Sequence, residues 1–407
     1  MSFGDSDRFE PPPSPPWVYT VSVPAVGEDE FNFAILPKRP GVFVFEDERG
    51  GTIAMASTAN LRRMIRDRLA PPDTEDGPKR RIDYRNLVAT IRALTVGSAF
   101  EADWAYLQHA RQRTPNSAAV FAERNQPWFV HCDPETTHPR WVKTAHPGRP
   151  PTGRQGVYVG PFARKRSARQ YIEMLEDAFD LCRYHHILVQ APHGNACAYK
   201  DMGKCPAPCD GSVSMSTYKS QIDDSIRFAR SPVESWRAEI ESHMHAASES
   251  HDFERAACCR RLLDATEPAT RRDCAHAADL NDFAYLAVMP AEREHTARLF
   301  VIRGGWIEPF VDIQMDCTES GIEAALERAH RRVESISMTI HNAMLENIGI
   351  VCRHLLQPKR KPNEGSFLRL DKSLRVDEIR RAVRALQFRR PPDDKQSAVQ
   401  EQFFTES

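Results

Sequence analysis

Four cysteines fall within one short stretch of the sequence, and thiolates are natural ligands for soft metal centres. They are Cys182, Cys197, Cys205 and Cys209, separated by steps of fifteen, eight and four residues. Pro206-Ala207-Pro208 lies between the last two and removes backbone freedom and amide donors there. The pattern predicts a four-cysteine metal site. Zinc and an iron–sulfur cluster both accept four cysteines, and buried free thiols are the remaining alternative.

The residues around these cysteines resemble a known signature. Tyr199 is followed by Gly203-Lys204-Cys205 and then by Ala207 to Gly211, while Tyr158 to Phe162 and a helix expected over 163–179 lie upstream. This run from Gly156 to Arg230 resembles the cysteine-rich region of UvrC, the incision subunit of bacterial nucleotide excision repair. The resemblance implies that the four cysteines carry a [4Fe–4S] cluster, with zinc as the alternative.

A second segment that resembles UvrC is a helical hairpin expected over 233–268. Apolar residues recur at helical spacing on both sides of a break at Ser250-His251. A hairpin of this size buries little area alone and gains stability by pairing with another like it. The residue order resembles the UVR motif, which implies docking on a UvrB-like helicase; a structural hairpin inside a larger bundle is the alternative. The interface residues would be Met244, Phe253, Ala256, Ala257 and Arg260, with Phe253 as the aromatic anchor.

The N-terminal part has the order strand, turn, strand, helix. Val42 to Phe45 and Thr52 to Met55 predict a hairpin, and Asn60 is expected to cap a helix over Leu61 to Leu69. With Pro40-Gly41 before the first strand, this order resembles the GIY-YIG nuclease domain, the N-terminal module of UvrC.

The catalytic positions of that domain depart from the family pattern, because they align with Phe43, Ala54, Met64 and Tyr106. The family's reaction uses a tyrosine-assisted water, an arginine that stabilises phosphoryl charge and a carboxylate that holds a divalent metal. Phe43 has no hydroxyl, Met64 carries no charge, and the phenol of Tyr106 stays protonated at neutral pH. We therefore expect a degenerate nuclease site, with magnesium or manganese required only if a shifted register, through Arg63 or Glu101, restores activity.

A basic run without Asp or Glu covers residues 136–172. Trp141 and Tyr158 alternate with its charges, a pattern that suits a phosphate backbone. The alternative is an ordinary solvated loop and helix face. The residues expected to contact damaged DNA are Arg140, Lys143, Arg164, Lys165 and Arg169.

The whole-chain composition is that of a globular protein. The chain has 407 residues, of which 41% are hydrophobic and 27% are charged, and no window resembles a membrane span or a signal peptide. We expect a cytoplasmic protein without a membrane partner, in which ten cysteines indicate metal binding and free thiols rather than disulfides. The net charge of −1 confines any nucleic-acid surface to a local patch.

These elements predict a multidomain α+β protein with five parts: a disordered Pro-rich tail over 1–30, a degenerate GIY-YIG-like domain over 31–135, a basic and cysteine-rich cluster region over 136–232, the UVR hairpin over 233–268, and truncated UvrC-like strands with C-terminal helices over 269–407. In the same way, the patterns predict strands near 87–96, 118–122, 128–132, 283–289, 298–303 and 306–313, and helices over 100–112, 215–228, from 321 into the 340s, and 376–386. The second nuclease and the helix–hairpin–helix elements of UvrC have no expected counterpart.

Three functional hypotheses follow. The first is a UvrC-like accessory subunit of nucleotide excision repair that docks on UvrB, contacts DNA and has lost its nuclease chemistry. The second is an active DNA endonuclease that makes a lesion-adjacent incision. The third is a four-cysteine zinc adaptor outside repair.

Overall fold

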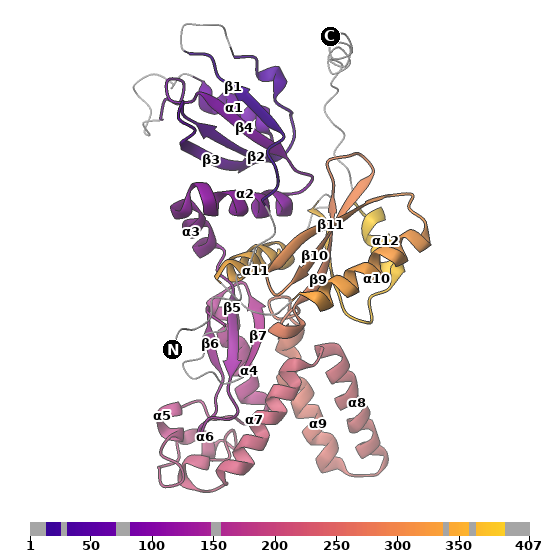
Figure 1. Cartoon of the computed structure of the whole chain (residues 1–407). Coiled ribbons are helices and arrows are strands. Elements are labelled where there is room, and N and C mark those ends of the chain that lie inside the picture. The colour runs from indigo at the N-terminus through magenta and orange to yellow at the C-terminus, as the bar shows by residue number, and fades with distance from the viewer. Residues whose placement is uncertain are drawn as a thin grey trace, which may run out of the picture.

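The computed structural model describes residues 14–25, 31–70, 82–147, 156–336, 342–357 and 364–386. Three four-stranded antiparallel sheets with their covering helices make up this part of the chain (Figure 1). The mixture of sheet and helix confirms the predicted α+β class. No helix in these ranges is long and apolar enough to cross a membrane.

The N-terminal sheet has the strand order β1-β4-β2-β3. Its strands are β1 (Tyr19–Ser22), β2 (Gly41–Glu46), β3 (Thr52–Thr58) and β4 (Thr90–Thr95). Helix α1 (Leu61–Leu69) starts where expected, because the Asn60 side chain accepts a hydrogen bond from the Arg63 amide. Side chains alternate along β2, so Phe43 enters the core under α1 and Val42 enters the core on the opposite face, under α2 (Ala99–Arg113).

The middle sheet has the order β6-β5-β7-β8. Its strands are β5 (Trp128–Cys132), β6 (Val142–Thr144), β7 (Val157–Phe162) and β8 (Ala278–Asp279), and the helices that follow β7 are α4 (Lys165–Ala178), α5 (His185–Leu188), α6 (Ala198–Asp201) and α7 (Met215–Arg230). Next comes a long antiparallel hairpin of α8 (Val233–Glu249) and α9 (Phe253–Thr266), which projects from the molecule (Figure 1). The chain then returns to the sheet through β8.

The C-terminal sheet has the order β11-β10-β9-β12. Its strands are β9 (Ala284–Pro290), β10 (Thr296–Arg303), β11 (Trp306–Gln314) and β12 (Ser366–Arg369). Helices α10 (Glu319–Ser335) and α12 (Val376–Arg384) share the core on one face of the sheet. Helix α11 (Asn342–Leu355) packs with α2 in the core on the other face.

Helix α2 therefore joins the N-terminal and C-terminal sheets. One apolar core contains Val42 of β2, Trp104 of α2 and Phe300 of β10. Ion pairs add to it, since Glu101 pairs with Arg298, Asp103 with Arg353 and His354, and Arg111 with Glu346. The parts expected over 31–135 and 269–407 are thus packed around a common helix (Figure 1).

Three expectations about local structure are wrong in the described residues. The tail expected to be disordered over 1–30 contains β1, which pairs with β4, and Trp17, which stacks on His109 with ring centroids 4.0 Å apart. Residues 118–122 belong to helix α3 (Pro115–Arg124), which begins with a proline suited to a first helical turn. The helix expected from Gly321 into the 340s ends at Ser335, and Asn342 begins another. Residues 1–13 and 26–30 of the expected tail, and the expected linker from Pro71 to Lys79, lie outside the described residues.

Candidate functional site

The positions that align with catalytic residues of GIY-YIG nucleases lie in apolar surroundings. Phe43 on β2 is 0% exposed, and its ring centroid lies 5.0 Å from that of Phe45. Ala54 on β3 and Met64 on α1 pack against the same core. Hydrocarbon packing therefore occupies the positions where phosphodiester hydrolysis needs a hydroxyl and a positive charge.

Tyr106 lies on the other face of the same sheet. It belongs to α2 and packs against the core that contains Val42, with its ring centroid 5.3 Å from that of Phe121. Burial raises the pKa of the Tyr106 phenol, so it stays protonated at neutral pH. The sheet separates Tyr106 from Phe43, and the four aligned positions do not form one site.

Arg63 and Glu101, the residues that a shifted register would use, form other contacts. Arg63 is exposed on α1 and forms an ion pair with Asp67 at 3.6 Å. Glu101 is only 5% exposed, and its Oε1 lies 2.5 Å from Nη1 of Arg298. Across the described ranges, no three His, Cys, Asp or Glu side chains are grouped so as to hold a metal ion.

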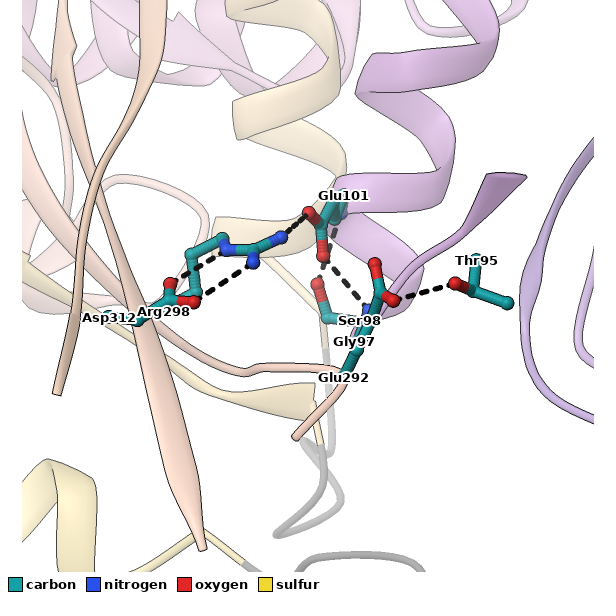
Figure 2. Close-up of polar contacts among 7 residues, drawn as sticks. All are labelled: Thr95, Gly97, Ser98, Glu101, Glu292, Arg298 and Asp312. Atoms are coloured by element: carbon teal, nitrogen blue, oxygen red, sulfur yellow. Dashed lines mark hydrogen bonds and ion pairs between the residues drawn. The ribbon is translucent and has the colours of Figure 1, made fainter. Parts of the chain in front are cut away.

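Figure 2 shows how Glu101 of α2 contacts the C-terminal sheet. Its Oε2 accepts a hydrogen bond from the Gly97 amide at 2.9 Å, and its own amide donates to Ser98 Oγ at 3.1 Å. Arg298 donates two further hydrogen bonds to Asp312, at 2.8 and 3.0 Å. Burial raises the pKa of Glu101, while Arg298 and the Gly97 amide act in the opposite direction. The Ser98-x-x-Glu101 spacing is a readable helix-start signal, but the sequence does not reveal its distant partner Arg298.

The four cysteines lie in a cysteine lobe, residues 181–212, which contains α5 and α6 (Figure 1, bottom). Hydrogen bonding between Cys182 and Cys205 raises the pKa of the Cys182 thiol and lowers that of Cys205 to about 6. Burial raises the pKa of the Cys209 thiol, and the charge of Asp210 acts in the same direction. Cys197 is half-buried and immediately precedes α6.

The four thiols are donors of the type that a soft-metal site uses. In the described structure they are not grouped as a complete set of ligands. Cys182, Cys205 and Cys209 are close enough for their charges to influence one another. The backbone of Ala207 is left-handed (φ 56°) and bends the chain between Cys205 and Cys209, both of which are buried. Cys182, Cys205 and Cys209 therefore lie in one neighbourhood of the lobe, and Cys197 stands at the start of a neighbouring short helix.

The basic residues predicted to contact DNA are all exposed, but they lie in different places. Arg164 and Lys165 stand at the start of α4, where Lys165 Nζ lies 5.2 Å from the ring centroid of Trp128. Trp128 pairs with Phe162 at one end of the middle sheet. Arg140 precedes β6 at the opposite end, where its charge lowers the pKa of His185 in addition to the larger effect of burial.

The other members of the predicted DNA surface also divide. Lys143 is exposed on the edge strand β6, whereas Arg169 is paired with Glu173 at 2.7 Å. Trp141, expected to alternate with the surface charges, is buried, and its indole N–H donates to Ser225 Oγ at 2.9 Å. Its large apolar ring is needed in the core of the middle sheet. Arg164 and Lys165 are thus the two predicted contacts that lie side by side, at one end of the middle sheet.

The α8–α9 hairpin presents its predicted interface residues to solvent. Phe253 is 65% exposed, and Ala257 and Arg260 are exposed on the same helix. Met244 and Ala256 are half-buried between the two helices. The hairpin is anchored at its base by buried residues such as Trp236 and Leu263, whereas its large exposed apolar side chain, Phe253, lies in the far half.

Comparisons with known proteins relate the chain to UvrC proteins. The family model described as the UvrC/Cho excinuclease middle domain matches residues 130–228, which include the four cysteines and the basic residues but not the hairpin. UvrABC system protein C from Kocuria rhizophila is 27% identical over 275 residues, covering 67% of this chain and 39% of the relative. The protein of the same name from Mycolicibacterium paratuberculosis is 24% identical over 347 residues, covering 79% of this chain and 50% of the relative.

The similarity extends well beyond the matched family model, although the chain spans only 39–50% of the length of these two relatives. No solved structure matches the chain significantly. The matched middle domain and the similarity over two thirds or more of this chain show that the chain is similar to UvrABC system protein C.

Proposed function

We propose that this chain is an accessory protein of nucleotide excision repair that docks on a UvrB-like helicase and contacts DNA but does not cut it. The observation that carries this proposal is the placement of the nuclease-aligned positions. Phe43 is buried in one apolar core, Ala54 and Met64 are half-buried against that core, and Tyr106 lies on the other face of the sheet. A catalytic centre needs its groups in one water-accessible place, within hydrogen-bonding reach of the reacting atoms.

The exposed half of the hairpin supports the docking part of the proposal. Phe253 is a large aromatic side chain left 65% exposed, and residues of this kind dominate interface energies when a partner covers them. Ala257 beside it is small enough to allow a second helical hairpin to approach closely. A UvrB-like hairpin of the same type is the partner that the UVR resemblance implies.

We further propose that the cysteine lobe holds a [4Fe–4S] cluster through Cys182, Cys197, Cys205 and Cys209. Such a cluster would cross-link the segments of the lobe, whose α-helices α5 and α6 are each only four residues long. Anaerobic purification tests this assignment. A brown protein with bound iron and broad absorption near ~400 nm is expected. A colourless protein with one bound zinc would instead support the zinc adaptor.

Contact with DNA is assigned to the start of α4. Arg164 and Lys165 are both exposed there, and the first turn of the helix adds backbone amides that favour anions. Because this end of α4 is distant along the middle sheet from the cysteine lobe, DNA binding and cluster binding use separate residues. Reversal of both charges, in Arg164→Glu/Lys165→Glu, should weaken DNA binding and reduce its dependence on salt.

The experiment that tests the proposed function is a competition assay with a genuine UvrC. Incision of damaged duplex by UvrB and UvrC is measured while this chain is added in increasing amounts. We expect the wild-type chain to reduce incision by occupying UvrB, and the Phe253→Ala variant to do so much less. Incision that is unaffected by the wild-type chain would overturn the docking proposal, and nicking by the chain in the absence of UvrC would overturn the accessory role.

A further inference from the structure

A groove runs along the free edge of the C-terminal sheet, away from the residues assigned above. It has a volume of about 470 Å³ and lies between β11 and α10. Strand β11 is the outer strand of its sheet, and α10 lies along the same sheet (Figure 1). We propose that this groove binds an extended segment of a partner protein, which adds to β11 as a further antiparallel strand.

The backbone of β11 is ready for such a strand. The Met315 amide donates to the His295 carbonyl, so residues 311, 313 and 315 bond toward β10 and the alternate residues point their backbone groups outward. The Gln314 carbonyl is used by the Cys317 amide, so among the described residues the Gln314 amide and both backbone groups of Asp312 remain on the open edge. Pro309 interrupts the edge upstream, so strand addition is confined to residues 310–314.

The facing wall is a strip of small residues on α10. Gly321, Ala324 and Ala325 line the groove, and Cys317 closes the end near the start of the helix. A Cβ added at Gly321 would lie 2.7 Å from the Cys317 sulfur, so only glycine allows the helix to approach Cys317 this closely. Alternate side chains of an added strand would enter the space above the two alanines, which suits β-branched aliphatic residues.

Charge gives the groove a direction. Asp316 lies at the end near Cys317, while Arg328 lies at the other end, where its guanidinium carbon is 5.1 Å from the ring centroid of Phe310. No ion pair joins either residue to another side chain in the part of the chain that the structure describes. A strand antiparallel to β11 runs from Asp316 toward Arg328. Its complementary charges are a basic residue first and an acidic residue about six positions later, on the same face of the strand.

The occupant is therefore an extended partner segment with a Lys-x-Val-x-Val-x-Glu type of pattern. This proposal does not depend on UvrB docking or DNA contact, because their residues lie in the hairpin and the middle sheet. The probe is a labelled, end-blocked peptide, Lys-Thr-Val-Thr-Val-Thr-Glu, and binding to the full chain is followed by fluorescence anisotropy. We expect saturable binding that the Ala324→Trp variant weakens at least about tenfold, since the indole fills the groove.

A charge swap tests the direction. The double variant Asp316→Lys/Arg328→Glu should bind the probe about tenfold more weakly and should prefer the reversed peptide, Glu-Thr-Val-Thr-Val-Thr-Lys. Arg331→Glu is the matched control, since Arg331 is exposed on α10 but does not line the groove. All three altered residues are exposed, so thermal unfolding should be unchanged.

Three results would overturn the proposal: no saturable binding of either peptide, equal binding by the wild type and the charge-swapped variant, or self-association of the chain that Ala324→Trp abolishes. The last result, seen by sedimentation velocity, would show that a second copy of the chain occupies the β11 edge.

Discussion

The carboxylate of Glu101 on α2 and the guanidinium of Arg298 on β10 form an ion pair between segments 197 residues apart, with 2.5 Å between Oε1 and Nη1. The pair lies where the helix that would supply a nuclease's metal ligand packs against the C-terminal sheet. Because Arg298 is also bonded to Asp312, Glu101 links α2 to two strands of the C-terminal sheet. This structural role of α2 supports the proposal that the helix does not supply a catalytic metal ligand.

Removal of the Glu101 side chain should therefore destabilise the fold. In Glu101→Ala, Arg298 loses a buried partner, and the expected loss in the free energy of unfolding is about 3 kcal/mol. Urea unfolding measures this loss, and Arg63→Ala is the control because its pair with Asp67 is solvent-exposed and is expected to contribute less than about 0.5 kcal/mol. Equal losses in the two variants would show that α2 is not held by this pair.

Phe43 and Tyr106 should respond differently when a phenol hydroxyl is added or removed. Phe43→Tyr places a hydroxyl in an apolar core and should lower the free energy of unfolding by about 1–3 kcal/mol. Tyr106→Phe removes a hydroxyl from a half-buried ring and should change it by less than about 1 kcal/mol. A neutral effect of Phe43→Tyr in urea unfolding would mean that position 43 has access to water, as a catalytic tyrosine requires.

Substitutions in the hairpin should affect protein stability and partner binding separately. Phe253→Ala removes an exposed ring, so unfolding should be unchanged while affinity for a UvrB hairpin falls by about 2 kcal/mol or more. Leu263→Ala removes a side chain that is only 4% exposed and should destabilise the fold by about 2–4 kcal/mol. Thermal unfolding and calorimetric titration distinguish these outcomes, and a large stability loss in Phe253→Ala would place Phe253 in the core.

Glu176 on α4 should make stability depend on pH. Burial raises the pKa of its carboxyl to about 7, with Arg183 opposing and Glu173 and Asp177 reinforcing this shift. The folded protein thus retains a proton that the unfolded chain releases, so this stabilisation is complete below the ordinary range of Glu and is lost as pH rises through about 7.

The free energy of unfolding should therefore be lower at pH 8 than at pH 5 by about 1–2 kcal/mol, after allowance for solvent screening of this partly exposed carboxyl. Glu176→Gln should remove this difference, whereas Glu173→Gln, at an exposed site, should keep most of it, because burial contributes more to the shift than Glu173 does. Identical pH dependence in wild type and Glu176→Gln would contradict the assignment.

Local patterns in the sequence predict much of the fold. The start of α1 at Asn60, the helices α4 and α7, and the hairpin of α8 and α9 all follow from caps and helical periodicity. The turn between β10 and β11 follows from Gly304-Gly305, whose φ angles of 52° and 93° favour glycine. These features depend on residues close together in the chain.

The arrangement of the elements is harder to predict, because it depends on distant contacts. Helix α2 buries ten of its fifteen residues, including Glu101 and Asp103, since sheets on both sides cover it. Its ionic partners Arg298 and His354 lie 197 and 251 residues away. The burial of Trp141 is likewise not predicted from the sequence, because its partner Ser225 is 84 residues away. Which residues could do chemistry is readable from the sequence, but which of them meet is not.

The measurement that tests the central claim most directly is incision of damaged duplex DNA in the presence of UvrB and magnesium or manganese, with this chain in place of UvrC and a genuine UvrC as the positive control. With Phe43 buried in one core, Ala54 and Met64 packed against that core and Tyr106 across the sheet, we predict no nick above background. A metal-dependent nick made by the wild-type chain, and abolished by substitution at these positions, would contradict the account.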